Sequence, residues 1–268
     1  MRSLELIPSE PLRPYVRLIW VLELDEASVF GPPERISPDG LVELVFHFRT
    51  PMACRYDGEE FARQPRSVAV SQTRRFVEIR PEAASGLVSV RFHPWGAYHF
   101  FRPPVSELAD RQVPTEALWG RAALELEERL AEASGERERV ALVEQFLLAQ
   151  LRRHRKADVE PLVRAVWNRQ GRSRVTELCR DLGIGERRLE RTMATALGTT
   201  PKGFARLARF LHACRLLRRG HGPPGLAGVG LVCGYYDQSH FTAEFKAFSG
   251  MTPRQFAQTG NVSFFELD

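Results

Sequence analysis

The stretch that decides the fold is VTELCRDLGIGERRLERTMATALG at residues 175–198, and a similar stretch follows it, LAGVGLVCGYYDQSHFTAEFKAFSG at residues 226–250. Each reads as a short apolar helix, a glycine turn and a second helix whose apolar residues recur every three to four positions. This pattern is typical of a helix-turn-helix unit, which fits its second helix into the major groove of DNA. Two such units predict an all-α C-terminal domain that binds double-stranded DNA.

In the first unit, Leu189 and Met193 lie four residues apart and are expected to point inward. The opposite face of the same helix is polar and is expected to read bases. An arginine can donate two hydrogen bonds to guanine, and a glutamate can accept one from cytosine. The predicted DNA-binding residues of this unit are Arg187, Arg188, Glu190 and Arg191.

In the second unit, Gly234 is expected to form the turn and Asp237 to cap the second helix. Inward positions are predicted for Val229, Val232, Cys233, Phe241, Phe245 and Phe248. The outward face is small and nearly uncharged, which predicts a smaller contribution to specificity. The predicted DNA-binding residues here are Gln238, Ser239, His240, Thr242 and Lys246.

The net charge is divided unevenly between the two halves of the chain. Residues 152–268 carry 20 Lys and Arg against 10 Asp and Glu, whereas residues 1–151 carry 18 against 23. A basic C-terminal half suits phosphate contacts, and an acidic N-terminal half would be repelled by DNA. A helix over residues 202–220 would separate the two units, so that one chain could reach successive major-groove turns.

The segment GYYDQSHFTAEFKAFSGMTPRQF at residues 234–256, with Arg209, Ala213 and Leu217 of the connecting helix, resembles the DNA-binding domain of the AraC/XylS family of bacterial transcription regulators. The resemblance covers about residues 159–257. It implies a seven-helix domain with two helix-turn-helix units, whose second helices lie near DNA bases. It also implies a transcription activator or repressor, with RNA polymerase as a further candidate partner.

The N-terminal half predicts a different architecture, so the chain is expected to be a two-domain α+β protein. Runs rich in Val, Ile, Phe and Trp predict several short strands and hence a barrel or a sandwich, at residues 15–24, 41–48, 66–73 and 86–93. Residues 121–133 and 136–151 have helical periodicity and predict a hairpin of helices. The expected divisions are a β-rich domain with this hairpin at 1–151, a linker at 152–158, the DNA-binding domain at 159–260 and a tail at 261–268.

Composition indicates a soluble cytoplasmic protein. No apolar run approaches the length of a membrane span, and the N-terminal residues lack a signal-peptide core. The four cysteines have no CxxC spacing, which argues against a zinc site. The sequence contains no motif of a hydrolase, a metalloprotease or a nucleotide-binding enzyme, so we expect no catalysis and no cofactor.

Three functions remain open for the N-terminal half. Residues 38–48 and 89–111 resemble a poorly characterised domain type that is fused to such DNA-binding domains, which by analogy implies a sensor of a small-molecule effector or a homodimerisation module. The alternative is that the N-terminal half is only a structural dimerisation or partner-docking module. A metal-dependent enzyme, built on Glu43, His47, His93 and His99, is less favoured because their spacing matches no known motif. The candidate ligand-binding residues are the aromatics Trp20, Phe46, Phe48, Phe92 and Trp95, and the favoured alternative is that they form the barrel core.

Overall fold

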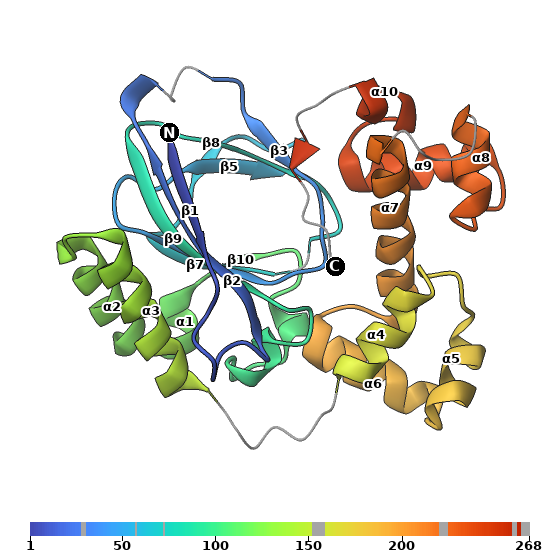
Figure 1. The fold of residues 1–268 in the computed structure, drawn as a ribbon, viewed down its shortest axis with the longest axis horizontal. Coiled ribbons are helices and arrows are strands. Elements are labelled where there is room, and N and C mark those ends of the chain that lie inside the picture. The colour runs from blue at the N-terminus through green and yellow to red at the C-terminus, as the bar shows by residue number, and fades with distance from the viewer. Residues whose placement is uncertain are drawn as a thin grey trace.

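The computed structural model describes residues 1–27, 31–56, 58–71, 73–151, 159–219, 225–258 and 262–263. It has an N-terminal part made of two β-sheets and three helices, and a C-terminal part made of helices (Figure 1). The predicted α+β organisation is therefore confirmed. The predicted linker at 152–158 and most of the predicted tail lie outside the described residues, so these boundaries stay predictions.

The N-terminal part contains two sheets, and among the described residues neither closes on itself. The arrangement is thus a pair of open sheets rather than a barrel. The six-stranded antiparallel sheet has the order β1 (Arg2–Leu6), β2 (Val16–Leu24), β9 (Ser85–Phe92), β4 (Glu43–His47), β7 (Ser67–Val70) and β10 (Gln112–Pro114). The five-stranded sheet has the order β11 (Val262–Ser263), β3 (Glu34–Ile36), β8 (Val77–Arg80), β5 (Ala53–Tyr56) and β6 (Ala62–Arg63), with β11 parallel to β3.

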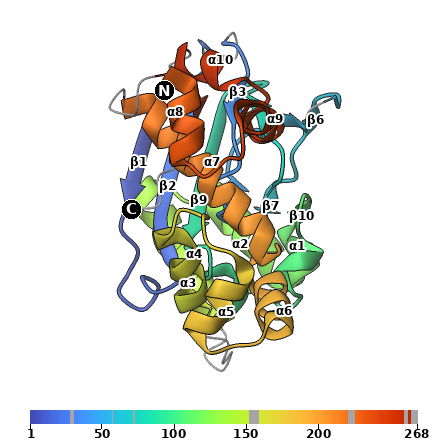
Figure 2. The ribbon, with the colours of Figure 1, turned by 90° about the vertical axis from the view of Figure 1, so that its right-hand side faces the viewer.

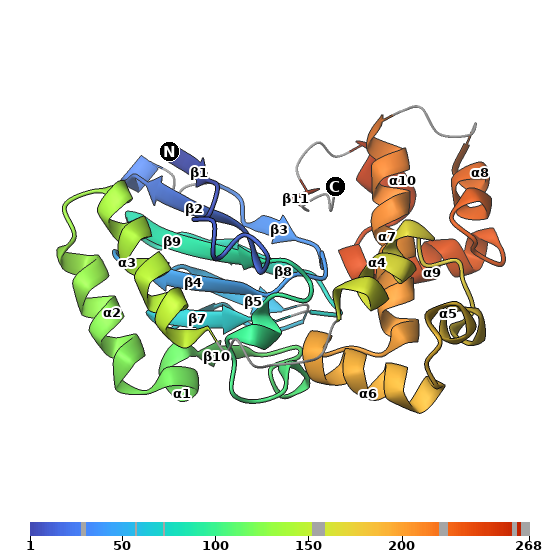
Figure 3. The ribbon, with the colours of Figure 1, turned by 60° about the horizontal axis from the view of Figure 1, so that its bottom comes forward.

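The two faces of the six-stranded sheet belong to different cores because successive strand residues point to opposite sides. Phe46 pairs in register with Val88, and both pack toward the helices α1 (Thr115–Trp119), α2 (Arg121–Glu132) and α3 (Glu136–Gln150). Val45 and Leu87 point the other way and pack with Ile79 of the five-stranded sheet. The helices thus cover one face and the second sheet covers the other (Figure 3).

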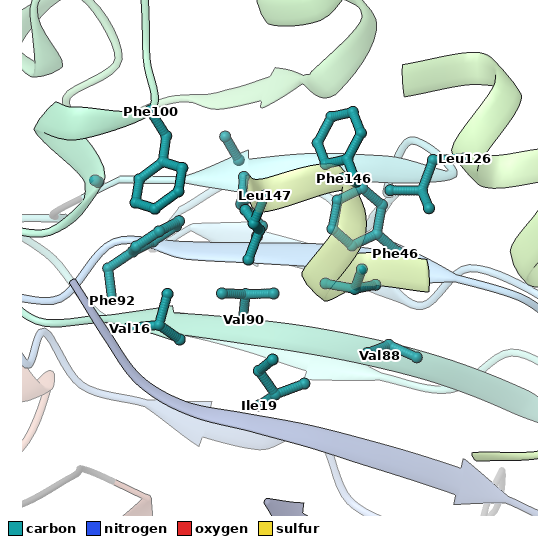
Figure 4. Packing of buried hydrophobic residues seen from close by; sticks show 14 of the residues in the cluster. Val16, Ile19, Phe46, Val88, Val90, Phe92, Phe100, Leu126, Phe146 and Leu147 are labelled. Carbon is teal, nitrogen blue, oxygen red and sulfur yellow. The ribbon is translucent and has the colours of Figure 1, made fainter. Parts of the chain in front are cut away.

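The core under the helices is built from aromatic and branched side chains. Figure 4 shows Phe46 beside Phe146 of α3, and Phe92 beside Phe100. The Phe46 and Phe146 rings meet edge to face with centroids 6.3 Å apart. Fully burying one such ring contributes about 1.5–3 kcal/mol, so this layer provides much of the stability of the N-terminal part.

The C-terminal part has seven helices among the described residues, as the family resemblance implied. They are α4 (Glu160–Asn168), α5 (Val175–Leu182), α6 (Glu186–Leu197), α7 (Pro201–Arg219), α8 (Gly225–Val232), α9 (Gln238–Ser249) and α10 (Pro253–Gln258). Phe204 and Phe210 of α7 are fully buried at its centre, together with Phe241 and Phe245 of α9.

The two parts pack closely against each other. A Cβ atom placed on Gly40 would lie 2.8 Å from the Cδ2 atom of Leu207, and one on Gly250 would lie 2.3 Å from the Phe76 ring. Residues of the two 3-10 turns η2 (Ala97–His99) and η3 (Val105–Glu107) also lie against α6. The N-terminal part is therefore fitted to the C-terminal half of α6, to α7 and to the C-terminal end of α9, and leaves the N-terminal end of α6 uncovered.

Candidate nucleic-acid interface

The first helix-turn-helix unit has the predicted geometry. Gly183 ends α5 with a φ of 63°, the left-handed conformation that glycine adopts without strain, and Gly185 precedes α6. The side chains of Leu189 and Met193 are fully buried, and they fix α6 against the domain core. Glu177 accepts a hydrogen bond from the backbone N–H of Arg174 at 3.1 Å, which stabilises the start of α5.

The four predicted reading residues of this unit, Arg187, Arg188, Glu190 and Arg191, are all exposed on α6. None forms an ion pair with any residue that the structure describes. Their charges are therefore free to meet phosphates and base edges. Ala194, one turn further along α6, is half-buried and lines a cavity instead.

The second unit is also formed, with one correction. Gly234 has a φ of 80°, and the Asp237 carboxylate accepts a hydrogen bond from the backbone N–H of His240 at 2.7 Å, which caps α9. The prediction that Val232 faces inward is wrong, because Val232 is 40% exposed. Helix α8 is apolar on every side, so periodicity cannot say which of its valines is buried.

The predicted reading residues of α9 lie at its open N-terminal end and along its outer face. Gln238, Ser239, His240 and Lys246 are exposed, and Thr242 is half-buried. The His240 ring is partly engaged within the protein, because its Nε2 atom lies 3.7 Å from the Glu244 carboxylate. Sequence reasoning missed Tyr236, which is 92% exposed directly before the capping Asp237.

Helix α7 holds the two units apart. Its 19 residues give a length of about 28 Å at 1.5 Å per residue. Helices α5 and α6 lie toward one end of α7 (Figures 1 and 2). Helix α9 packs near the middle of α7, beside Arg206, Arg209 and Phe210. One turn of B-DNA is about 34 Å, which is the spacing at which two helices of one chain would read successive major-groove segments.

A cavity of about 550 Å³ lies between the N-terminal and C-terminal parts. Its wall contains hydroxyl and cationic side chains from both parts, and apolar atoms from Leu207 and Phe248. Among the residues that the structure describes, no aspartate or glutamate lines the cavity. The polar lining residues are Thr73, Arg74, Ser106, Thr199, Thr200, Lys202 and Arg206.

The structure does not bring the five candidate ligand-binding aromatics together. Phe46, Phe48 and Phe92 are buried in the core between the six-stranded sheet and the helices. Trp20 lies on the opposite face of that sheet, and Trp95 lies at the contact with α4, where its ring stacks on His93 at a centroid distance of 5.0 Å. Their role in ligand binding stays a prediction.

The opposite face of the six-stranded sheet carries a buried charged group that the sequence did not reveal. Glu43 accepts hydrogen bonds from the Trp20 indole at 2.9 Å, from Arg91 at 2.9 Å and from Ser89. Burial acts to raise the pKa of Glu43, but Arg91 and these hydrogen bonds outweigh it and lower the pKa. Burial raises the pKa of the neighbouring Asp39, which lies 3.5 Å from Arg91.

The residues considered for a metal site lie apart. The His47 Nδ1 atom lies 3.2 Å from the Arg66 carbonyl oxygen, His93 stacks on Trp95, and His99 packs on Tyr15. Over the described ranges, no three His, Cys, Asp or Glu side chains gather as a metal-binding group. None of the helices in those ranges has the length and apolar composition needed to cross a bilayer.

Two protein families match separate regions of the chain. Residues 4–114 match a domain of unknown function, DUF6597, and residues 178–259 match a helix-turn-helix domain. Curated relatives include the HTH-type transcriptional activator RhaR of Salmonella arizonae and of Salmonella paratyphi B, each 31% identical over 85 residues. Those residues are 32% of this chain and 29% of each relative, so the chain spans less than a third of the relatives that it matches.

Solved structures of similar chains include ToxT from Vibrio cholerae, at 10% identity and a TM-score of 0.45 over 90% of this chain and 97% of that one. Another is an AraC family transcriptional regulator from Rhodopseudomonas palustris, at 25% identity and a TM-score of 0.35 over 37% of this chain and 94% of that one.

Proposed function

We propose that the C-terminal part of this chain, which matches a helix-turn-helix domain, is of the AraC/XylS type, and that the protein is a sequence-specific DNA-binding transcription regulator. The observation that carries the proposal is the pair of reading helices. Helices α6 and α9 each present exposed polar residues, while the N-terminal part packs against the C-terminal half of α6 and against Gly250 at the end of α9.

We propose that α6 contributes more to sequence specificity than α9. Arg187 and Arg191 would each donate two hydrogen bonds to a guanine, and Glu190 would accept one from a cytosine. Arg188 and Lys246 would contact phosphates. On α9, the uncharged Gln238, Ser239 and Thr242 and the partly engaged His240 would add weaker base contacts, so the first unit would dominate specificity.

The test uses the full chain and a duplex selected by that chain from a random-sequence library. Fluorescence anisotropy should show that the logarithm of the binding constant falls linearly with the logarithm of the salt concentration. If six or more phosphates are contacted, the binding constant should fall by about 10³-fold or more between 50 and 200 mM salt. A scrambled duplex serves as the DNA control. Failure of the folded chain to select or retain any duplex would refute the proposal.

A charge-matched variant separates specific contacts from general electrostatics. Arg187→Ala should weaken binding to the selected duplex, whereas Arg121→Ala should not. Arg121 is an exposed arginine at the start of α2, in the N-terminal part. Within the described ranges it pairs only with Glu125, four residues along its own helix. An equal loss for both variants would show that net charge, rather than α6, determines the affinity.

The N-terminal part is proposed to receive a small-molecule effector. The support is the cavity between the two parts; Arg74 in its wall pairs with Asp110 and Arg206 pairs with Glu244, which leaves Lys202 as the cation that favours an anion. Citrate and inorganic phosphate are suitable first probes: one of them should raise the melting temperature of the full chain and change its affinity for the selected duplex. Lys202→Ala should remove both effects.

If neither these anions nor a panel of neutral metabolites changes DNA binding, the N-terminal part has a structural role instead. A homodimer found by light scattering at that point would favour dimerisation.

RNA polymerase is the further proposed partner, since the RhaR relatives are activators by name. In vitro transcription from a promoter with the selected duplex upstream should then change when the chain is added. These proposals place the protein in the cytoplasm, with the DNA that it binds.

A further inference from the structure

A buried carboxylate lies at the centre of the C-terminal part. The Glu244 side chain on α9 is only 5% exposed, and it meets two arginines of α7. The Arg206 Nε atom lies 2.6 Å from one carboxylate oxygen, and an Arg209 terminal nitrogen lies 3.4 Å from the other. A buried carboxylate is tolerated only when such partners compensate for its lost hydration, so α9 is held to α7 at this point.

Arg209 also reaches the first helix-turn-helix unit. Its other terminal nitrogen donates a hydrogen bond to the Gly171 carbonyl at 3.1 Å, in the turn between α4 and α5. Gly171 has a φ of 68°, and a Cβ atom there would lie 2.0 Å from the Ala205 carbonyl oxygen. The turn thus rests directly on the backbone of α7, and one guanidinium group joins it to Glu244.

The two units also touch each other beside this bridge. The Arg172 side chain follows Gly171 and packs over Gly234, where a Cβ atom would lie 3.1 Å from the Arg172 Cγ. On α9, His240 lies one helical turn before Glu244 and 3.7 Å from its carboxylate. The bridge is therefore one turn away from the reading end of α9.

We propose that Arg209 and Glu244 are positioning residues, which fix α9 relative to the first unit and thereby set the half-site spacing that the protein accepts in DNA. This inference rests on the proposed function. One inserted base pair moves a half-site by about 3.4 Å and rotates it by about 34° around the duplex. Two reading helices held rigidly cannot adjust to both the shift and the rotation, whereas reading helices that can move relative to each other can.

The experiment measures the affinity of the full chain for three duplexes. These are the selected duplex, the same duplex with one base pair inserted between its half-sites, and a duplex that keeps only the half-site of the first unit. The wild-type chain should lose about 10²-fold in affinity on insertion, because the second contact is lost.

Two arginine-to-lysine variants on the same helix form a matched pair. Arg209→Lys keeps the charge but loses the planar fork whose two terminal nitrogens reach Gly171 and Glu244 separately. Arg206 pairs with Glu244 and lies over the Phe248 ring on the same helix α9, so Arg206→Lys keeps the ion pair and does not involve the turn at Gly171. Arg209→Lys should reduce the insertion penalty by about fivefold or more, and Arg206→Lys should leave it unchanged. Glu244→Gln should behave like Arg209→Lys.

Affinity for the single half-site is the readout that a general loss of structure would move, and it should stay at the wild-type value in all three variants. If Arg209→Lys keeps the wild-type insertion penalty, or if it weakens the single half-site as much as the selected duplex, the inference is overturned. Should Glu244→Gln fail to fold by circular dichroism, the lysine pair decides. A wild-type chain that binds DNA without spacing preference refutes this inference alone, whereas one that binds no DNA refutes the proposed function.

Discussion

Acidification should weaken the N-terminal part through a single histidine. His47 on β4 is 2% exposed, and its Nε2 atom has no hydrogen-bond partner among the described residues. Burial lowers the pKa of His47 from 6.5 to about 4, and hydrogen bonding to the Arg66 and Pro65 backbone only partly opposes this. Protonation would place a charge and a donor without an acceptor inside the sheet.

The sign and size of the effect follow from proton linkage. Between pH 6.5 and pH 4 the unfolded chain binds a proton at this histidine that the folded chain does not, so the free energy of unfolding falls as the pH falls. Between pH 7.5 and pH 5 the loss from His47 is about 2 kcal/mol.

Urea unfolding of the wild type and of His47→Gln at pH 7.5, 6 and 5 isolates this contribution. Glutamine keeps a donor for the Arg66 carbonyl but does not titrate, and the other ionisable groups cancel in the comparison. The wild type should lose about 2 kcal/mol more than the variant between pH 7.5 and pH 5. Equal losses, or a His47 pKa near 6.5 in an NMR titration, would refute the reasoning.

Two further predictions concern the DNA-binding part. Arg187→Ala and Arg191→Ala should each reduce discrimination at one operator base pair by about 1–3 kcal/mol, and Thr242→Ala should reduce it by less. The measurement is the affinity of each variant for point variants of the selected duplex. A larger loss of discrimination in Thr242→Ala than in both arginine variants would contradict the prediction. Gly171→Ala should lower the free energy of unfolding by about 3 kcal/mol or more, because its Cβ atom would overlap a carbonyl oxygen of α7. Gly183→Ala, also left-handed but in open space, should cost only about 1–2 kcal/mol in the same denaturation assay.

The long elements could be predicted from the sequence, and the short ones could not. Strands β2, β4, β7 and β9 were expected because runs of β-branched and aromatic residues mark them. Strands β3, β6, β10 and β11 have two or three residues each, too few for any alternation to show. Their positions depend on pairing with distant strands, which local sequence does not encode.

The same limit applies to the candidate site. The 3.6-residue period placed Arg187 and Arg191 opposite the buried Leu189, and both arginines are exposed. The role of Glu244 could not be predicted, because its partners Arg206 and Arg209 lie 38 and 35 residues away in sequence. The candidate aromatics were grouped by residue type, but strand register and chain position send them to three different cores.

The position of the cavity between the two parts has a consequence for how ligand binding and DNA binding would be coupled. Because neither part alone forms its wall, its shape depends on the distance between them. A molecule that bound there more tightly when the chain is on DNA would strengthen DNA binding by the same factor by which DNA strengthened its own binding. Operator DNA would then act as an allosteric effector of ligand binding in the cavity. The fraction of chains that hold the ligand would depend on whether the operator is bound.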